Sequence, residues 1–572
     1  MSSSRDSLLQ TLVEKTGLDL SELDKLMTTP PDPINGDFTL PCFVMAKAMR
    51  KAPKMIAEEL AADFPLPTGI EKVLAVNGYL NFFADRIAQG AAILKSIEVL
   101  GSAYGTSAPC GKTAVVDYSS PNTGKQLAFH HLRSTMIGNA LDKCYRAAGW
   151  QVQSVNHLGD WGTAFGKLIV MYLRSGKTDS NEDLATLNLQ TLNDLYVDFA
   201  HVAKEVPDLD DQARAAFALM EQGDSVHLKL WSAFCDVTIA ELKNLYALMG
   251  VSFDHYIGEA FFNDHLEHVV DTLKSKDLMI KSQERDVVML DEENMPPCLI
   301  RKSDGSSLYA TRDLAAAMYR QDRWKFDRCL YVVDNGQALH FKQVFKVLEK
   351  IGFDWHDKMH HIPFGLILQY NEAEQKWSKG SSKSGNSNTL REVFEAARDK
   401  ILLFIDEKNP ELENKEETAM QIGISALVFN DLKNRRLIDV KFDWDAALSF
   451  EGDTGPYVQN AHVRLCSIMD KIGRRVDVKD VDFSQLKEEQ AQDLIRLLGQ
   501  LNDKVEAVVA TNEPYMVTQY CLRIAEASHR FIHHCRVLGT PEEDARLFLV
   551  QCAQQVMENA LKLIGLNPIR KM

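Results

Sequence analysis

The chain has 572 residues, of which 64 are basic and 80 acidic, and its net charge is −16 at neutral pH. A chain of this length typically forms about three or four domains. The hydrophobic content of 45% is that of a globular protein. No run of about 18 apolar residues is present, which argues against a transmembrane helix. The acidic balance argues against a protein that coats DNA, although local basic spots can still contact nucleic acid.

Residues 1–18 are expected to form an amphipathic helix and not a signal peptide, because no apolar core precedes a small-residue cleavage site. The ten cysteines are scattered without any Cys-x-x-Cys pair. Neither a zinc site nor a disulfide framework is therefore predicted, and we expect a cytoplasmic location.

Residues 1–112 combine helical patterns with the alternating run "KVLAVNGYLNFFAD", which predicts an α+β domain. The last part of this region, "GTSAPCGKT", is rich in small and turn-forming residues and is expected to be a linker.

Residues 113–405 alternate strand-like and helix-like segments. The strand candidates are "TAVVDYS", "QVQSVNH", "CLYVVDN" and "GLILQY", and a helix-like run from His131 follows the first of them. Strand, crossover helix and strand indicate a doubly wound parallel sheet of the Rossmann type. A charged helical stretch around 182–250 interrupts this pattern and is predicted to be an insertion.

Residues 406–572 show helical periodicity almost throughout. In "YVQNAHVRLCSIMDKI" the apolar side chains recur every three or four residues and form one stripe. The sequence therefore predicts an α/β Rossmann-type catalytic domain with an N-terminal α+β domain and a C-terminal all-α helical bundle.

The first strand-to-helix crossing, "SSPNTGKQLAFHHLRST", concentrates polar chemistry. Ligands of doubly wound sheets bind beyond the carboxyl ends of the strands, where helix N-termini offer free N–H groups and positive potential. With Lys125, His130 and His131 added, this crossing suits a polyphosphate. The alternative is that the two histidines only cap or pack the helix.

A second polar segment, "SKGSSKSGNSNTL", has lysines among small residues and suits a mobile phosphate-binding loop or, equally, a surface linker. Neither segment contains a P-loop motif. Elsewhere, oxygen acceptors follow the strand candidates or lie on a helix: Asp117, Asn122, Asp313 and Gln337. Such groups suit a guanidinium ligand, although each could instead serve an internal ion pair or a helix cap.

Five blocks together make the chain similar to a known family. They are "VVDYSSPNTGKQLAFHHLRSTMIGNAL", "NHLGDWGTAFG", "SDGSSLYATRDLA", "QALHFKQVF" and "EGDTGPYVQNAHVR". In order and spacing they resemble the class I arginyl-tRNA synthetases, and the resemblance extends over essentially the whole chain. It implies a tRNA-elbow-binding domain at 1–112, a catalytic domain at 113–405 and an anticodon-binding domain at 406–572.

The resemblance also implies roles for individual residues. The arginine pocket would comprise Asp117, Ser119, Asn122, His131, Tyr309, Asp313 and Gln337. ATP would contact Lys125, His130, His131, Ser381 and Ser382, and the catalytic charges would come from Lys125, His131, Lys379 and Lys383. Contacts with tRNA would come from Tyr79, Asn81, Asn460 and Arg464.

Three departures from the family pattern are visible. In the His-x-Gly-His signature, Ala128 replaces the first histidine and His130 replaces the glycine. In the second signature, "KGSSK", Ser382 replaces the fourth-position lysine. The resemblance implies that this loss is common in the family and that the lysine after Ser-Pro-Asn, here Lys125, compensates for it. Asn460 replaces a tyrosine that could stack on a base, an interaction worth roughly 1–3 kcal/mol.

The implied reaction joins L-arginine to tRNA(Arg) with Mg-ATP through arginyl-adenylate, releasing AMP and pyrophosphate. The implied partners are tRNA(Arg), L-arginine and ATP, with no DNA, no membrane, no resident metal and no organic cofactor, and we expect a monomer. Ala128 motivates an alternative, a tRNA-binding synthetase paralogue without catalysis. A simpler nucleotidyltransferase is a third hypothesis, which the length of the chain disfavours.

Overall fold

The computed structural model describes the chain except for residues 1, 31, 33–34, 68, 303–308, 372–374 and 380–388. The chain forms two compact units. One comprises Met1–Tyr104, Leu465–Leu501 and Glu526–Val556, and the other comprises Gly105–Arg464, Asn502–Ala525 and Met557–Met572.

A five-stranded parallel sheet lies at the centre of the second unit, with the strand order β11-β10-β4-β5-β6. Its strands are β4 (Thr113–Asp117), β5 (Gln151–Asn156), β6 (His255–Tyr256), β10 (Arg328–Tyr331) and β11 (Met359–His361). The chain starts at β4, proceeds to β5 and β6 on one side, and later adds β10 and β11 on the other. The order therefore reverses between β4 and β10, which is where doubly wound sheets bind ligands.

The predicted first crossing is confirmed. β4 is an apolar run buried on both faces, as expected for a strand covered by helices on either side. The crossover helix α6 (His131–Ala147) starts at His131 and is almost entirely buried. It then leads back to β5, which pairs with β4 from Thr113↔Gln151 to Asp117↔Val155.

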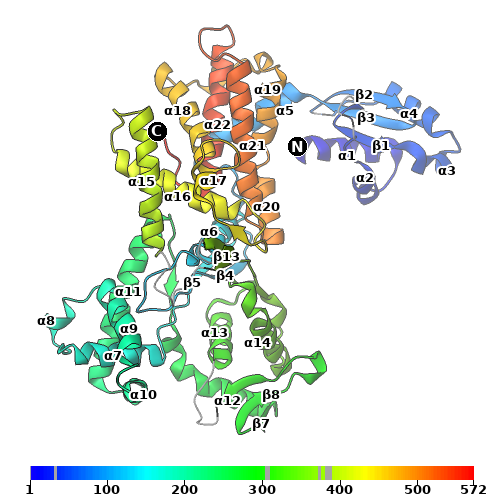
Figure 1. Cartoon of the computed structure of the whole chain (residues 1–572). Helices are drawn as coiled ribbons and strands as arrows, with labels where there is room; N and C mark the ends of the chain where they lie inside the picture. Colours follow the sequence, from blue (N-terminus) through cyan, green and yellow to red (C-terminus); the bar gives the residue numbers. More distant parts are fainter. Residues whose placement is uncertain are drawn as a thin grey trace. The chain divides into compact units, whose positions relative to one another are not determined.

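The insertion is helical, as predicted. Its helices are α8 (Asn181–Leu184), α9 (Leu189–Val202), α10 (Leu209–Glu221) and α11 (Ser225–Leu248). They form a core with α7 (Thr163–Arg174), centred on buried side chains such as Phe165, Leu192 and Phe234. Figure 1 shows α7 to α10 as a teal group.

The strand predicted at "GLILQY" forms but belongs to another sheet. β12 (Ile367–Asn371) pairs with β13 (Lys376–Lys379) and β14 (Val440–Lys441). A further antiparallel sheet, which the sequence did not predict, follows the insertion and comprises β7 (Met279–Ser282), β8 (Arg285–Val288) and β9 (Cys298–Arg301). Its strands are only four residues long, so they show little periodicity.

Two helices pack between the β7–β8–β9 sheet and the central one. α13 (Tyr309–Trp324) and α14 (Ala338–Ile351) share a core with β10 and β9, together with α12 (Leu266–Ser275). The 3-10 turn η4 (Glu259–His265) leads into α12. α13 precedes β10 and α14 follows it, so each runs antiparallel to the strand.

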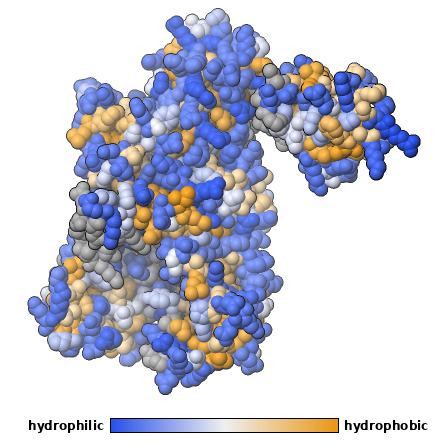
Figure 2. Space-filling model, turned by 45° about the vertical axis from the view of Figure 1, so that its right-hand side comes forward, coloured by the Kyte–Doolittle hydropathy of each residue, from blue (hydrophilic) through white to orange (hydrophobic). Residues whose placement is uncertain are grey.

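The N-terminal domain is α+β, as predicted. Its sheet has the order β1-β3-β2, and its elements are α1 (Ser2–Thr16), α2 (Leu20–Leu26), β1 (Phe38–Pro41), α3 (Ala46–Met49), α4 (Pro53–Ala62), β2 (Ile70–Val76) and β3 (Tyr79–Ala84). Side chains such as Leu8, Leu40 and Phe82 form its core. Apolar side chains also gather on its surface (Figure 2). Its exposed large hydrophobic side chains include Phe43, Met55 and Tyr79.

The rest of the chain is helical apart from β14, which agrees with the predicted bundle. The helices are α5 (Arg86–Leu100), α15 (Leu390–Lys408), α16 (Lys415–Leu432), α17 (Trp444–Leu448), α18 (Gly455–Ile472), α19 (Glu489–Leu498), α20 (Leu501–Thr511), α21 (Tyr515–His534) and α22 (Glu543–Leu563). The predicted apolar stripe of α18 faces the interior, and its residues Val458, Ala461 and Leu465 are fully buried. None of the helices in the described residues is long and apolar enough to cross a membrane.

We predict that Gly138→Ala destabilises the protein. A Cβ at this position of α6 would lie 2.2 Å from Cβ of Tyr118, at the end of β4. Such overpacking costs about 1–3 kcal/mol, so the melting temperature should fall. The matched control is Gly90→Ala in α5, whose Cβ would meet two methyl groups of Ile495, at 3.3 and 3.6 Å. Equal thermal shifts in the two variants would contradict the prediction.

Candidate active site

A cavity of about 200 Å³ opens where the strand order reverses. Its lining comes from the residues after β4, the residues after β10, the start of α6, and the segment before β12: Ser119, Ser120, His130, His131, Arg133, Ser134, Val332, Val333, Asp334, Phe364, Gly365, Leu366 and Ile367. Ligand pockets commonly measure about 300–1,000 Å³, so this cavity fits part of a nucleotide.

The two histidines both line the cavity at the N-terminus of α6. The Ala128 N–H donates to Nδ1 of His131 at 3.0 Å, which orients that ring. The rings of His130 and His131 contact each other in a tilted arrangement, with centroids 4.2 Å apart and an interplanar angle of 31°. His130 has φ −65°, an ordinary helical value, so its backbone conformation does not require the glycine of the signature.

The turn after β4 is strained and held by internal hydrogen bonds. Ser119 and Ser120 have φ of +67° and +46°, which is unusual for residues with side chains. The Ser119 hydroxyl is buried between Thr135, at 2.8 Å, and Tyr246, at 2.7 Å. Ser119 therefore shapes the turn, and the structure gives no direct sign of the predicted contact with arginine.

Asp117 and Arg320 form a buried ion pair of 2.7 Å. The other oxygen of Asp117 accepts a hydrogen bond from the Ser120 hydroxyl at 2.8 Å. Burial alone would lower the pKa of Arg320, but Asp117 raises it, so the guanidinium stays charged. The carboxylate predicted for a guanidinium ligand thus already binds a guanidinium of the chain itself.

Asp313 remains more accessible. Its carboxylate lies 2.5 Å from Nε2 of His340, and both side chains are about one quarter exposed. Tyr309 is on the same face of α13 and is 69% exposed. Gln337 is exposed just before α14, near the end of β10. These residues form an open group of acceptors at the carboxyl edge of the sheet.

Several further groups at this edge were not among the predicted site residues. His157 follows β5; burial lowers its pKa, and its Nδ1 has no hydrogen-bond partner among the described residues. Burial also raises the pKa of Asp160 to about 6 and that of Glu259 to about 7, although Arg312 opposes both shifts. His157 and Asp160 belong to "NHLGDWG", one of the five blocks that resemble the family. That resemblance could have identified them as site residues.

The Asn122–Lys125 loop adjoins the helical insertion. The Nζ of Lys125 lies 3.8 Å from the ring centroid of Tyr196, in α9, and the Gly124 N–H donates to Thr238 at 3.0 Å. Asn122 is exposed and its backbone bridges to Gly159, where a Cβ would meet the Asn122 side chain. In this arrangement the ammonium of Lys125 binds an aromatic face, a contact that a phosphate would have to replace.

The second signature lies mostly outside the described residues, and this applies to Ser381, Ser382 and Lys383. Lys379 is described only as the last residue of β13, where its backbone pairs with Leu368. After the gap, Thr389 bridges to Ala128, and the Leu390 N–H donates to the Leu127 carbonyl at 2.7 Å. Ala128 therefore contributes its backbone next to the first signature.

The predicted tRNA contacts differ in exposure. Tyr79 is exposed and packs edge-on against Phe43, with centroids 5.3 Å apart. Asn81 is only 3% exposed, and the Thr39 hydroxyl donates to its Oδ1 at 2.5 Å, so it joins β1 to β3 inside the domain. A nearly buried side chain presents little surface to RNA, and the contact of Asn81 with tRNA stays a prediction. Asn460 and Arg464 lie on one face of α18, and Arg464 is exposed.

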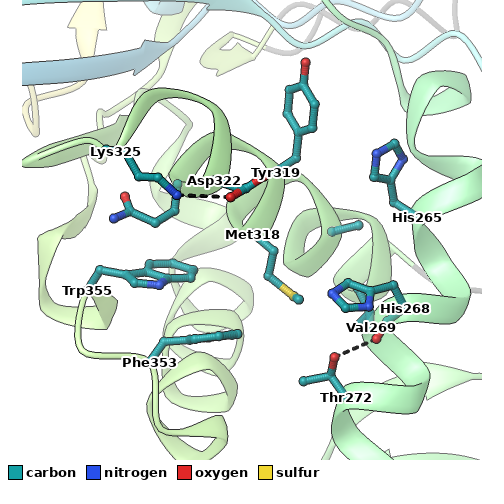
Figure 3. A pocket seen from close by; sticks show the side chains of 12 residues that line it. His265, His268, Val269, Thr272, Met318, Tyr319, Asp322, Lys325, Phe353 and Trp355 are labelled. Atoms are coloured by element: carbon teal, nitrogen blue, oxygen red, sulfur yellow. Dashed lines mark hydrogen bonds and ion pairs between the residues drawn. The ribbon is translucent and has the colours of Figure 1, made fainter.

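A larger cavity, of about 500 Å³, lies at the other end of α13 (Figure 3). Met318 and Tyr319 meet His268 and Trp355 there, and an Asp322–Lys325 ion pair of 3.0 Å lies beside them. Because α13 runs antiparallel to β10, these residues lie toward the amino edge of the sheet. Reaction sites of such sheets lie at the opposite edge, so the smaller cavity is the candidate active site.

A signature histidine on the first crossover helix of a parallel sheet, with a helical region after that sheet, is the arrangement expected of a class I aminoacyl-tRNA synthetase. Family models agree. The model described as "tRNA synthetases class I (R), catalytic domain" matches residues 94–444. The "Arginyl tRNA synthetase N terminal domain" matches 3–84 and the "DALR anticodon binding domain" matches 458–572. The chain therefore belongs to the class I arginyl-tRNA synthetase family.

Individual relatives agree along the whole length. An arginine–tRNA ligase of Alkaliphilus metalliredigens is 43% identical over 99% of this chain and 98% of its own. One of Clostridium perfringens is also 43% identical, over 98% of both chains. The arginyl-tRNA synthetase structure of Thermus thermophilus has a TM-score of 0.75 at 22% identity, covers 99% of both chains, and supports the fold.

We predict that Glu259→Gln stabilises the protein above neutral pH. Burial raises the pKa of Glu259 from an ordinary 4.5 to about 7. Between these values the folded chain keeps a proton that the unfolded chain releases, so stability falls as the pH rises. Glutamine removes this loss, which is on the order of 1–3 kcal/mol. Melting temperatures should rise at pH 8 and change little at pH 5.

Glu71→Gln, at an exposed position of β2, is the control and should show no such dependence on pH. A gain in the Glu259 variant that is equal at both pH values, or no gain at pH 8, would contradict the prediction.

Proposed function

We propose that the carboxyl edge of the central sheet performs both steps of arginine activation and transfer. Membership of the family assigns the overall reaction, the ATP-dependent charging of tRNA with arginine. The single observation that carries the proposal is the cavity at the reversal of the strand order, lined by the N-terminus of α6 and His131. The finer assignments below go beyond family membership.

In the first step the arginine carboxylate attacks the α-phosphate of ATP, which enters as its Mg²⁺ complex, and pyrophosphate leaves. In the second step a hydroxyl of the 3′-terminal ribose of tRNA attacks the adenylate carbonyl, and AMP leaves. Neither step requires a covalent bond to the protein. Positioning and stabilisation of phosphate charge therefore supply most of the rate acceleration.

ATP is proposed to bind at the small cavity. The N-terminus of α6 supplies free N–H groups and positive potential there, and His131 lies where a phosphate oxygen would need a donor. Lys125 would leave Tyr196 to contact phosphate. The second signature, which contains Lys379 and Lys383, is proposed to supply further positive charge; Lys379 pairs with β12, and Thr389, beyond the signature, bridges to Ala128.

Arginine is proposed to bind beside ATP, at the open group of acceptors. Asp313 and His340 would meet the guanidinium or α-amino group, with Tyr309, Gln337 and Asn122 around them. Asp117 would support the arginine site indirectly, because it pairs with Arg320 and accepts a hydrogen bond from Ser120 in the turn after β4. Lysine or citrulline would leave part of this group without a partner, which costs several kcal/mol when the site is closed.

We further propose that residues 1–112 bind the tRNA elbow and residues 406–572 the anticodon region, with Tyr79, Asn460 and Arg464 among the contacts. The exposed aromatic pair of Phe43 and Tyr79 supports the first assignment, because bases stack on such surfaces. The protein is proposed to act as a cytoplasmic monomer without a resident metal or organic cofactor.

The full-length relatives named as ligases favour catalysis over the paralogue without catalysis. The three family models together extend from residue 3 to residue 572, which disfavours a simpler nucleotidyltransferase. Arginine-dependent ATP–pyrophosphate exchange in the presence of tRNA is the decisive test. Binding of tRNA without exchange would instead support the non-catalytic paralogue.

We predict that His131→Ala lowers kcat/KM for arginylation at least about tenfold, the effect of one lost hydrogen bond to the transition state. Steady-state arginylation with varied ATP measures it. His268→Ala, in the exposed part of α12 beside the larger cavity, is the control and should leave the rate unchanged. Unchanged kinetics in His131→Ala would place the phosphate site elsewhere.

A further inference from the structure

Arg133 lies two residues after His131, lines the small cavity, and is only 1% exposed. Its Nη2 donates to the carbonyls of Arg436 and Ile438, each at 2.8 Å. Its Nη1 lies 3.2 Å from Oδ1 of Asp431, at the end of α16. The start of α6 is thus bound to the segment of residues 431–441, which the proposed mechanism does not use.

The same segment also binds the opposite wall of the cavity. The Gly365 N–H donates to the Arg436 carbonyl at 2.8 Å, so this single oxygen receives donors from both walls. The Leu366 N–H donates to Asp439 at 2.7 Å, and Ile367 pairs with Val440 as β12 meets β14. The spacing of the two walls therefore depends on where residues 431–441 lie.

Arg436 connects this segment to the helical region. Its guanidinium donates to the Pro363 carbonyl at 2.6 Å and to the Asn512 carbonyl at 3.2 Å, and it lies 3.5 Å from Glu513. Its backbone N–H also donates to Glu513 at 3.2 Å. Asn512 and Glu513 separate α20 from α21, within the part of the chain that matches the anticodon-binding domain.

Stability alone does not explain the Arg133–Asp431 pair. Both side chains are almost fully buried, yet both oxygens of Asp431 and the Nη1 of Arg133 lack a well-aligned hydrogen bond among the described residues. Burying such a pair costs as much desolvation energy as the attraction returns, or more. Burial accordingly raises the pKa of Asp431, although Arg133 opposes the shift. A pair of this kind is better explained by the geometry it imposes than by added stability.

We propose that Arg133 is a positioning residue for the charging reaction, which sets the spacing of the two cavity walls and ties it to the junction of α20 and α21. The proposal rests on the assignment of ATP to the small cavity. It implies that ATP use depends on Arg133 more than arginine use does. Arg133 lines the cavity assigned to ATP, whereas Asp313 and His340 lie on α13 and α14 and pair with each other.

Arg133→Lys is the first test. A lysine ammonium keeps the charge but lacks the fork that reaches two carbonyls and a carboxylate together. In tRNA-dependent ATP–pyrophosphate exchange, kcat/KM for ATP should fall about tenfold, while KM for arginine changes less than about twofold. Equal changes for both substrates, or unchanged kinetics, would overturn the proposal.

Arg546→Lys is the matched control. Arg546 is also a buried arginine, which donates to the Arg536 carbonyl at 2.8 Å and pairs with Glu488, but it does not line the cavity. Its lysine variant should lose thermal stability as Arg133→Lys does and keep its kinetic constants. If both variants show the same kinetic loss, the effect is general destabilisation and the proposal fails.

The link to the helical region is tested with Glu513→Gln. This variant should lower kcat/KM for ATP, as Arg133→Lys does. Residues acting through one network are non-additive, so Arg133→Lys with Glu513→Gln should lose less than the sum of the single losses in free energy. Additive losses would overturn the link. If Arg133→Lys does not fold, Asp431→Asn removes the charge pair and keeps the carbonyl contacts, and it should raise KM for ATP alone; an unchanged KM would then overturn the proposal.

The kinetics of two variants distinguish a wrong role for Arg133 from a wrong assignment of ATP to the small cavity. Unchanged ATP kinetics in His131→Ala would reject the assignment itself. Altered kinetics in His131→Ala with unaltered kinetics in Arg133→Lys would reject only the role of Arg133.

Discussion

The parallel pairing of β4 with β10 is the constraint on which the site depends. These strands are more than 200 residues apart in sequence, and they pair from Ala114↔Arg328 to Asp117↔Tyr331. The Asp117–Arg320 ion pair secures the end of this pairing from α13. Because the strand order reverses here, the crossover helices diverge and leave a cavity between the two carboxyl ends. The residues that we propose to bind ATP and arginine are positioned by the loops that follow β4 and β10.

In the described part of the chain, buried polar groups without hydrogen-bond partners also lie at the carboxyl edge of the sheet, near Asp313. Among the described residues, Nδ1 of His157, Nη1 of Arg320 and the hydroxyl of Tyr331 are buried without hydrogen-bond partners. Such groups cost free energy in an apolar interior, and native folds retain few of them. Their position around Asp117 indicates that stability was not the only requirement here. A substrate with several donors and acceptors would relieve part of that cost, which is consistent with arginine binding nearby.

Long, periodic segments could be predicted from the sequence, whereas pairing and partner choice could not. α6 starts at His131 and the insertion is helical because burial imposes a helical period on many residues. The strand at "GLILQY" was recognised, but its sheet was not, since an apolar run does not reveal its neighbour. For the site, the motifs identified His131 and Asp313 as candidates, and the structure places both toward the carboxyl edge of the sheet, at the starts of α6 and α13. It did not reveal that Asp117 is paired with Arg320 or that Asn81 is buried, because both depend on residues that are distant in sequence.

Ala128 and His130 depart from the first signature in their side chains, but their backbone contacts and conformation do not require the usual residues. Ala128 supplies an N–H to His131 and a backbone bridge to Thr389, and neither contact needs an imidazole at this position. His130 adopts an ordinary helical φ, so the usual glycine is needed there only for space. The ring that occupies this space lies tilted against His131 and is part of the cavity lining. At this signature the chain thus combines the backbone contacts of Ala128 with two imidazoles, His130 and His131, that line the cavity.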